Sequence, residues 1–256
     1  MNRLDHAFEE VKRHGRKALI GYLTAGDPDM ATCERNVRQA LRNGLDILEL
    51  GVPFSDPTAD GPTIQAASQR ARASGATVRH ILDLVARLRG EFSQPIVLFS
   101  YANPLFAYGY EKLCADAKAS GVDGLLVVDM PFEESGELRP HAERSDLCLI
   151  PLVAPTTSRE RAKEILNGAR GFVYYIMVKG VTGAREKLAD DVAEHISDLR
   201  RCTDLPIAVG FGVSSGSQAR EAAALADAVV VGSALVKAAE EGRLAALVDE
   251  LATALR

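Results

Sequence analysis

Two acidic residues that lie close together in the chain, Glu49 and Asp60, have the side chains that proton transfer requires. Glu49 lies inside the apolar run 47–50, which ends at Gly51 and is typical of a buried strand. A carboxylate is costly to bury unless it is paired or protonated. Asp60 follows in a loop rich in Pro, Asp and Gly that leads into a helix. An embedded acid and a second acid in the next loop predict a pair for general acid–base chemistry.

Each acid also has an ordinary structural interpretation. Glu49 could be a core carboxylate neutralised by a neighbouring Lys or Arg, but the expected strands carry neither in their interior, and Lys179 comes only where one ends. Asp60 could be only the N-cap of a helix that begins at about residue 63, with Pro62 in its first turn. Spacing alone does not decide between the roles of Asp60.

Short apolar segments alternate with helical patterns along the whole chain. The expected strands are 18–24, 46–51, 96–101, 124–128, 148–153, 171–178, 207–210 and 228–231. The expected helices are 3–14, 30–43, 63–73, 77–89, 110–119, 133–144, 159–167, 190–201, 216–224 and 234–254. Strands that are apolar throughout indicate a parallel sheet buried on both faces.

Eight such strands predict an α/β fold, a single (β/α)8 TIM barrel with an additional N-terminal helix, forming one domain over 1–256. The alternative is an open doubly wound sheet. Such a sheet would need two edge strands, and no segment carries the charges that protect an edge.

The residues at the strand ends should share one face of the barrel, where function resides in this fold. The ends present Tyr22/Thr24, Glu49, Phe99/Tyr101, Leu126/Asp129, Val153, Tyr174, Phe211/Gly212 and Gly232/Ser233. They predict an aromatic-lined, apolar mouth with one embedded acid, which suits a flat hydrophobic part of a substrate.

Glycines at the ends of the last two strands predict a phosphate site. Gly210 and Gly212 flank one strand end and Gly232 precedes Ser233 at the other, each just before a helix. Glycine lets backbone N–H groups approach an anion, and a helix N-terminus adds positive potential. The loop 180–183 after the sixth strand could close over the same region.

Composition excludes several classes of partner. The net charge of −5 without long blocks of one sign argues against nucleic acid. No apolar run approaches the ~20 residues of a membrane span, and the amphipathic N-terminus is not a signal peptide. Four widely spaced cysteines predict free thiols and a cytoplasmic location. No His, Asp and Glu cluster has metal-ligand spacing, so no metal is expected.

Seven motifs in order resemble the tryptophan synthase α subunit (indole-3-glycerol-phosphate lyase) family. They are GYLTAGDP at 21–28, LELGVPFSDPTADGPTIQ at 48–65, YANP at 101–104, DMPFEES at 129–135, GVTG at 180–183, GFGVS at 210–214 and VGSALVK at 231–237. The resemblance covers nearly the whole chain and implies a barrel with an extra N-terminal helix.

The resemblance also implies a reaction and a partner. It implies cleavage of indole-3-glycerol phosphate to indole and glyceraldehyde 3-phosphate, with no metal or organic cofactor in this chain. It further implies docking on a pyridoxal-phosphate β subunit in an α2β2 tetramer, to which indole passes through a tunnel. The face around Pro53, Asp56 and the loops 103–108 and 129–135 would contact that subunit.

Carried over by position, the family's residues have these counterparts. The general acid/base falls on Glu49, and the residue that binds the indole nitrogen falls on Asp60. The backbone groups that bind phosphate fall on Gly183, Gly212, Gly232 and Ser233, and the pocket walls fall on Tyr22, Phe99, Leu126, Tyr174 and Phe211. The mobile loops fall on 53–62 and 179–190, which includes Thr182. Three residues, Tyr22, Phe99 and Met177, depart from those usual in the family.

Two other functions compete with the lyase interpretation. A Schiff-base aldolase would use Lys179, which follows the sixth strand beside a glycine-rich loop. A non-catalytic partner would only activate a β subunit, although intact Glu49 and Asp60 argue against it.

Overall fold

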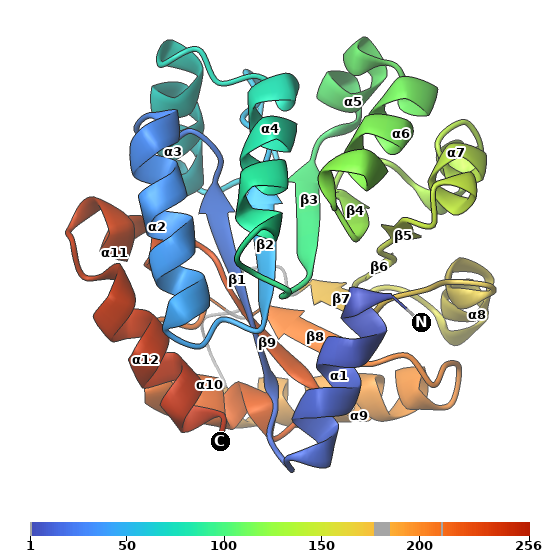
Figure 1. Ribbon diagram of the computed structural model, residues 1–256. Helices are drawn as coiled ribbons and strands as arrows, with labels where there is room; N and C mark the ends of the chain where they lie inside the picture. The colour runs from blue at the N-terminus through green and yellow to red at the C-terminus, as the bar shows by residue number, and fades with distance from the viewer. Residues whose placement is uncertain (1, 177–184, 211) are drawn as a thin grey trace.

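Nine parallel strands form one curled sheet in the part of the chain that the computed structural model describes, residues 2–176, 185–210 and 212–256. The strands are β1 (Ala18–Thr24), β2 (Ile47–Gly51), β3 (Ile96–Ser100), β4 (Gly124–Val127), β5 (Cys148–Leu149), β6 (Leu152–Val153), β7 (Val173–Ile176), β8 (Ile207–Gly210) and β9 (Ala228–Val231). Their order across the sheet is β5-β4-β3-β2-β1-β9-β8-β7-β6, and Figure 1 shows helices packed around them.

The helices alternate with the strands along the chain. They are α1 (Arg3–Arg13), α2 (Met30–Arg42), α3 (Pro62–Ala73), α4 (Val78–Arg89), α5 (Ala102–Tyr108), α6 (Tyr110–Ser120), the 3₁₀ helix η1 (Phe132–Gly136), α7 (Arg139–Arg144), α8 (Arg159–Leu166), α9 (Arg185–Arg200), α10 (Gly216–Ala223), α11 (Ser233–Glu240) and α12 (Leu244–Ala254). Of the helices within the described ranges, none is both long and apolar enough to cross a membrane.

The sheet closes into a barrel through the segment 148–153. Its first half, β5, pairs with β4, and its second half, β6, pairs with β7. Between the halves, the Ile150 N–H donates to the Leu125 carbonyl (2.8 Å), and the Tyr174 N–H donates to the Pro151 carbonyl (2.9 Å). The two ends of the nine-stranded order are therefore consecutive pieces of one segment. The predicted TIM barrel is confirmed, and the open doubly wound alternative is wrong.

Several element boundaries differ from the prediction, and prolines and glycines explain most of them. The expected strand 148–153 is interrupted because Pro151 has no N–H to donate. The expected helix 133–144 is divided because Pro140, which is disfavoured inside a helix, lies in the first turn of α7. The expected helix 234–254 is divided after Glu240, because Gly242, two residues later, is left-handed (φ 69°).

Two further helices were misjudged. The expected helix 190–201 begins earlier, at Arg185. The helix α5 was not expected, because Pro104 was interpreted as the end of a strand. A proline in the first helical turn needs no hydrogen-bond donor, so it also fits the start of α5.

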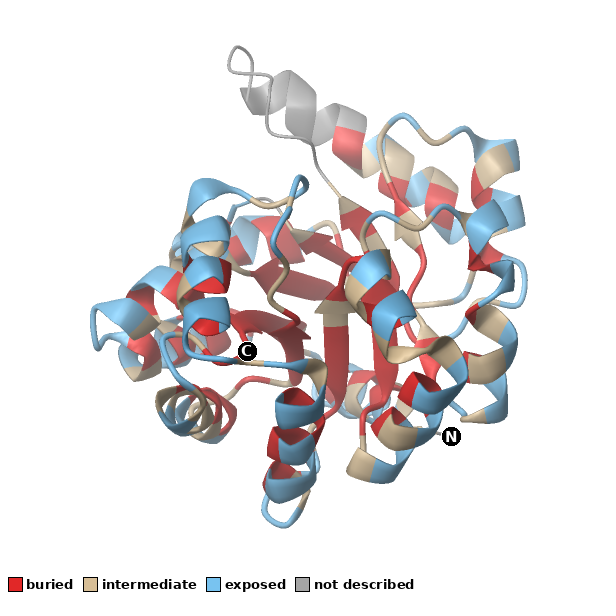
Figure 2. Ribbon diagram, turned by 90° about the horizontal axis from the view of Figure 1, so that it is seen from above, coloured by how far each residue is buried: buried red, intermediate tan, exposed pale blue. Residues whose placement is uncertain are grey.

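Apolar side chains fill two layers, one inside the barrel and one between the barrel and the helices. Residues of the inner layer alternate along each strand, as in Ile20 and Tyr22 of β1, because successive side chains point to opposite faces. Figure 2 shows buried strands at the centre and helices with exposed outer faces. The burial explains why the strands are apolar along their whole length.

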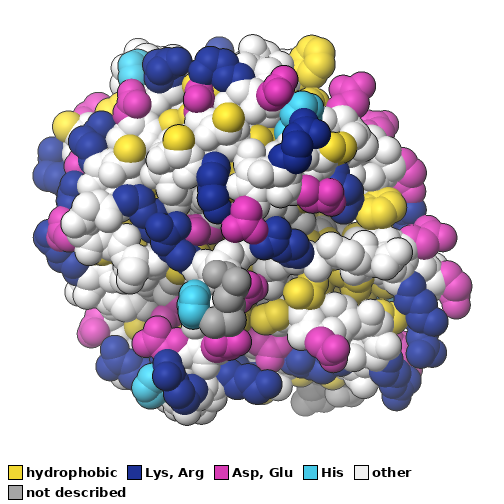
Figure 3. All heavy atoms as spheres, turned by 45° about the vertical axis from the view of Figure 1, so that its right-hand side comes forward, with side chains coloured by type: hydrophobic (Ala, Val, Ile, Leu, Met, Phe, Trp, Pro, Cys, Tyr) yellow, Lys and Arg dark blue, Asp and Glu magenta, His cyan; other side chains and the backbone are white. Residues whose placement is uncertain are grey.

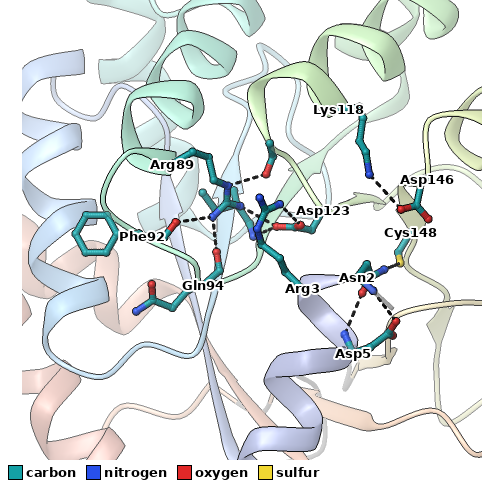
Figure 4. A network of polar contacts seen from close by, with 12 residues as sticks. Asn2, Arg3, Asp5, Arg89, Phe92, Gln94, Lys118, Asp123, Asp146 and Cys148 are labelled. Atoms are coloured by element: carbon teal, nitrogen blue, oxygen red, sulfur yellow. Dashed lines mark hydrogen bonds and ion pairs between the residues drawn. The ribbon is translucent and has the colours of Figure 1, made fainter.

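Helix α1 closes the N-terminal end of the barrel. Its buried residues Leu4, Phe8 and Val11 belong to the same cluster as the inner strand residues. The rings of Phe8 and Phe172 lie 5.8 Å apart. Figure 4 shows how charge fixes the helix: Arg3 of α1 pairs with the buried carboxylate of Asp123 (2.9 Å).

Asp123 is satisfied by more than this one partner. Its carboxylate also accepts hydrogen bonds from Arg89 (2.7 Å) and from the Ile96 N–H (2.8 Å) at the start of β3.

Because α1 closes one end of the barrel, a functional site is expected at the opposite end, where β1 to β4 meet the loops that follow them.

Candidate active site

Glu49 is a fully buried acid without a partner. It lies in β2, in register with Tyr22 of β1 and Val97 of β3, and its exposed fraction is 0%. Within the described residues, neither carboxyl oxygen has a hydrogen-bond partner, and no Lys or Arg pairs with it. Burial raises the pKa of Glu49 to about 8. In the described part of the chain Glu49 is therefore not neutralised by a basic neighbour, and its raised pKa keeps the side chain mainly protonated at neutral pH.

Aromatic and apolar side chains surround the acid. The rings of Tyr22 and Phe99 meet edge to face, with centroids 5.2 Å apart. Leu126, which is in register with Phe99, is fully buried in the barrel interior. The Tyr174 hydroxyl lies beside Gly210, 3.5 Å from the position that a Cβ would take there. These contacts bring the four described pocket residues to one end of the barrel.

Asp60 lies in the loop between β2 and α3 and is half-buried. Gly61, not Asp60, is the N-cap of α3, and no side chain caps this helix. The interpretation of Asp60 as a simple helix cap is therefore wrong. Burial raises the pKa of Asp60 to about 6, and the Tyr101 hydroxyl beside it opposes part of this rise.

The charges of the two acids act on the pKa values of the same pair of phenols. Burial is the main cause of the raised pKa values of Tyr22 and Tyr174, and the charges of both Glu49 and Asp60 raise them further. The structure thus brings the two acids that the sequence singled out to one aromatic mouth. A mostly neutral acid and a mostly ionised acid at pH 7 have complementary abilities, since the first can donate a proton and the second can bind a cation or an N–H group.

Three of the predicted phosphate residues lie at strand ends. Gly232 follows β9 as the N-cap of α11, and Ser233 is the first residue of that helix. A Cβ at Gly232 would lie 3.7 Å from Tyr22 and 3.8 Å from Ile64 of α3, so the start of α11 borders the mouth. Gly212 follows β8 with a left-handed backbone (φ 69°). First-turn N–H groups of a helix have no partner within it and can bind an anion.

Other predicted residues lie outside the described residues or face elsewhere. Gly183, Thr182, Phe211 and Lys179 are outside the described residues. Val153, which was expected at the mouth, packs in the outer layer.

The sequence analysis placed Tyr101 at the mouth but assigned it no role in the site, although the motif at 101–104 and its place at a strand end were the signal. A cavity between the 127–139 and 149–169 regions contains none of the predicted catalytic, phosphate or pocket residues, but Met130, Pro131, Phe132 and Ser135 of the predicted partner-contact loop 129–135 line it.

Comparisons with known proteins agree with one another. A family model for the tryptophan synthase alpha chain matches residues 8–254. A tryptophan synthase alpha chain from Citrifermentans bemidjiense is 51% identical over 98% of this chain and 94% of its own length. One from Geobacter sulfurreducens is 48% identical over 99% and 96%.

Solved structures match equally well. One from Aquifex aeolicus has a TM-score of 0.93 at 43% identity and covers 100% of both chains. A Mycobacterium tuberculosis tryptophan synthase structure has a TM-score of 0.93 at 38% identity, covering 100% of this chain and 98% of that one. With this sequence and fold similarity over nearly its full length, the chain belongs to the tryptophan synthase alpha chain family.

Proposed function

We propose that this chain cleaves indole-3-glycerol phosphate to indole and glyceraldehyde 3-phosphate by a retro-aldol reaction, with Glu49 and Asp60 as its catalytic residues. The observation that carries the proposal is the Glu49 carboxyl group, which is fully buried among aromatic side chains and has no partner in the described part of the chain. Such a group is kept neutral at pH 7 and is able to exchange a proton with a substrate.

Glu49 acts twice in one turnover. The bond to be broken joins C3 of indole to a glycerol carbon that bears a hydroxyl group. Protonated Glu49 first donates its proton to C3, and the resulting carboxylate then accepts the hydroxyl proton as the carbon–carbon bond breaks. The aldehyde and indole leave, and Glu49 is again protonated. Proton transfer of this kind contributes ~10²–10⁴-fold to a rate.

Asp60 acts as a carboxylate. It accepts a hydrogen bond from the indole N–H and stabilises the positive charge that grows on this nitrogen when C3 is protonated. With a pKa of about 6, the Asp60 side chain is mostly ionised at pH 7. Tyr22, Phe99, Leu126 and Tyr174, with Phe211, form the walls around the indole ring.

The substrate phosphate binds where two strand ends meet helix N-termini. Gly212, Gly232 and Ser233, together with Gly183, offer backbone N–H groups, and the α11 N-terminus adds positive potential. The grip on the phosphate, with closure of the loops 53–62 and 179–190, positions the substrate against Glu49. In this proposal the proton transfers of Glu49 and the indole contact of Asp60 are sufficient, so the chain uses no cofactor of its own.

A β subunit carrying pyridoxal phosphate is the proposed partner, in an α2β2 tetramer that takes up the indole. The proposed contact face includes Pro53, Asp56, α5 and the loop 129–135. On α5 the Phe106 side chain is 63% exposed, which is unusual for a large apolar residue in a surface helix. Its substitution by Ser should weaken partner binding while the lyase activity of the isolated chain is retained.

Further parts of the proposal concern the chain as a whole. We take residues 1–256 to act as one domain in the cytoplasm, without a nucleic-acid or membrane partner. On the face drawn in Figure 3, basic and acidic side chains are interspersed, so that this face has no large region of one sign.

The decisive experiment measures indole release from indole-3-glycerol phosphate by the purified chain, with and without a β subunit. We expect turnover by the chain alone, and a loss of ~10²-fold or more in Glu49→Gln. The matched control is Glu194→Gln on the exposed surface of α9, which should keep full activity. Wild-type turnover in Glu49→Gln would reject the proposed mechanism. A covalent adduct trapped by borohydride would favour the aldolase instead, and the absence of turnover by both the chain alone and the complex would favour a non-catalytic activator.

A further inference from the structure

Tyr101 stands on a fixed support at the end of β3. It is 3% exposed and is the N-cap residue of α5. Its carbonyl accepts a hydrogen bond from the buried Ser100 hydroxyl (2.9 Å). The next N–H, that of Ala102, donates to Asp129 at the end of the neighbouring strand β4 (2.7 Å). The backbone of Tyr101 is thus held on both sides by the barrel itself.

From this support Tyr101 reaches the loop that carries Asp60. Its hydroxyl oxygen accepts a hydrogen bond from the N–H of Ala59 (2.9 Å). Ala59 is the residue before Asp60. Its ring packs against Phe54 near the start of the same loop, with centroids 5.2 Å apart. One side chain from β3 therefore contacts both halves of the loop between β2 and α3.

The hydroxyl group has one proton left to donate. A phenol can accept and donate at once, and Ala59 uses only an acceptor position. Asp60 directly follows Ala59, which this hydroxyl contacts, and the hydroxyl lowers the pKa of the Asp60 carboxyl against the effect of burial. Donation to a carboxylate is a charge-assisted hydrogen bond, which stabilises the ionised form and fixes its direction.

Few other groups act on Asp60. The titratable groups that share the mouth with it are Tyr101, Tyr22, Tyr174 and Glu49. Within the described residues, no basic side chain contributes to its ionisation. Tyr101 is therefore the one described donor that offsets the burial of this carboxylate.

We propose that Tyr101 is a positioning residue for Asp60: it fixes the loop through Ala59 and orients the carboxylate that binds the indole N–H. This inference rests on the proposed role of Asp60. The bland alternative is that the Tyr101 ring only fills space against Phe54, in which case its hydroxyl would be dispensable.

Tyr101→Phe separates the two, because it keeps the ring and removes only the hydroxyl. The loss of one such hydrogen bond should lower kcat/KM about tenfold. The acidic limb of the pH–rate profile should move to higher pH, since Asp60 loses a group that favours its charge. The matched control is Tyr175→Phe, whose hydroxyl faces His195 in the outer layer (3.4 Å) and should leave both quantities unchanged.

A double-mutant cycle supplies the specific test. In an Asp60→Asn background the Tyr101→Phe change should have much less effect than in the parent, because the two residues act as a unit. Equal effects in both backgrounds, or a Tyr101→Phe chain with the parent's kcat/KM and acidic limb, would overturn the inference.

A second measurement does not depend on turnover. The ¹³C carboxyl signal of Asp60, followed by NMR during a pH titration, should have a higher midpoint in Tyr101→Phe than in the parent. An unchanged midpoint overturns the inference even if the lyase activity is present. If the chain released no indole at all, the proposed function would fail, and a raised midpoint would still support the contact between Tyr101 and Asp60.

Discussion

The ring of Tyr22 lies directly over the backbone of Gly51, on the strand that carries Glu49. The two strands are in register, with Tyr22 opposite Glu49 and Thr24 opposite Gly51. A side chain at Gly51 would overlap with the Tyr22 ring and hydroxyl. The Tyr22 hydroxyl lies 3.3 Å from the Thr24 hydroxyl. Glycine at this position therefore allows an aromatic wall to cover the strand just beyond the buried acid.

Gly51→Ala should displace the Tyr22 ring. Overpacking of this kind costs about 1–3 kcal/mol of unfolding free energy, which denaturant titration would measure, and lyase activity should fall with it. Adding Tyr22→Leu should recover much of the stability, because the smaller side chain vacates the space. The control Gly136→Ala places a methyl group in open space and should be nearly neutral. A Gly51→Ala chain as stable as the parent would contradict this packing argument.

The pH dependence of catalysis should report both acids. Asp60 must be ionised and Glu49 protonated, so kcat/KM should be bell-shaped, with limbs near the pKa values of about 6 and about 8. Because the groups share one mouth, the limbs belong to the pair. In Asp60→Asn the residual activity should lose its acidic limb. A profile that stays flat across this range would show that other groups carry the reaction.

The burial of Glu49 should also make folding stability depend on pH. Its pKa rises from the ordinary value of 4.5 to about 8 in the folded chain, so the folded state binds more protons between these values. Its stabilising contribution is complete below pH 4.5 and is lost as the pH rises through 8, by about 1.4 kcal/mol per pH unit within the window.

The measurement compares the parent with Glu49→Gln, which cannot titrate there. As the pH rises from 5 towards 8, the unfolding free energy of the parent should fall relative to that of the variant. The change should be confined to the range between the ordinary pKa of Glu49 and its raised value. Asp60 contributes a slope of the same sign in both proteins, so it cancels in the difference. Parallel stability curves would mean that Glu49 has an ordinary pKa.

A negative charge introduced at the start of α11 should weaken binding of the substrate phosphate. Ser233→Glu brings a carboxylate to the helix N-terminus where the phosphate is proposed to bind. We expect KM to rise about tenfold or more, since like charges repel at a site that otherwise attracts anions. Ser197→Glu on the exposed face of α9 adds the same charge away from this site. Equal KM values in the two variants would remove α11 from the phosphate site.

The barrel was predictable because two simple periodicities specify it. Apolar runs followed by amphipathic helices indicate parallel strands and crossovers, and their number indicates closure. Glu49 was predictable for a related reason, since a charge inside an apolar run with no basic neighbour demands an explanation. The element ends were less predictable, because Pro104, Pro140 and Pro151 each permit either a stop or a start.

The roles of the loop residues needed the three-dimensional structure. Asp60 and Gly61 are both acceptable N-cap types, so the sequence could not decide which one caps α3. Tyr101 lies far from Ala59 and Asp60 in the chain, and its hydrogen bond with the Ala59 N–H exists only because the loop after β2 folds back over the end of β3. Contacts of this kind have no local sequence signal.

The closure of one barrel end by α1 affects how hydrogen isotopes from solvent reach Glu49. Because Leu4, Phe8 and Val11 seal one end of the barrel, we expect water and substrate to reach Glu49 from the opposite end. On the proposed chemistry, a bound substrate isolates the acid from solvent, and the hydrogen delivered to indole in one cycle is replaced from the substrate hydroxyl. Exchange with heavy water is then confined to the interval between product departure and the next arrival, so the hydrogen that indole receives is the one that Glu49 carried when the substrate arrived.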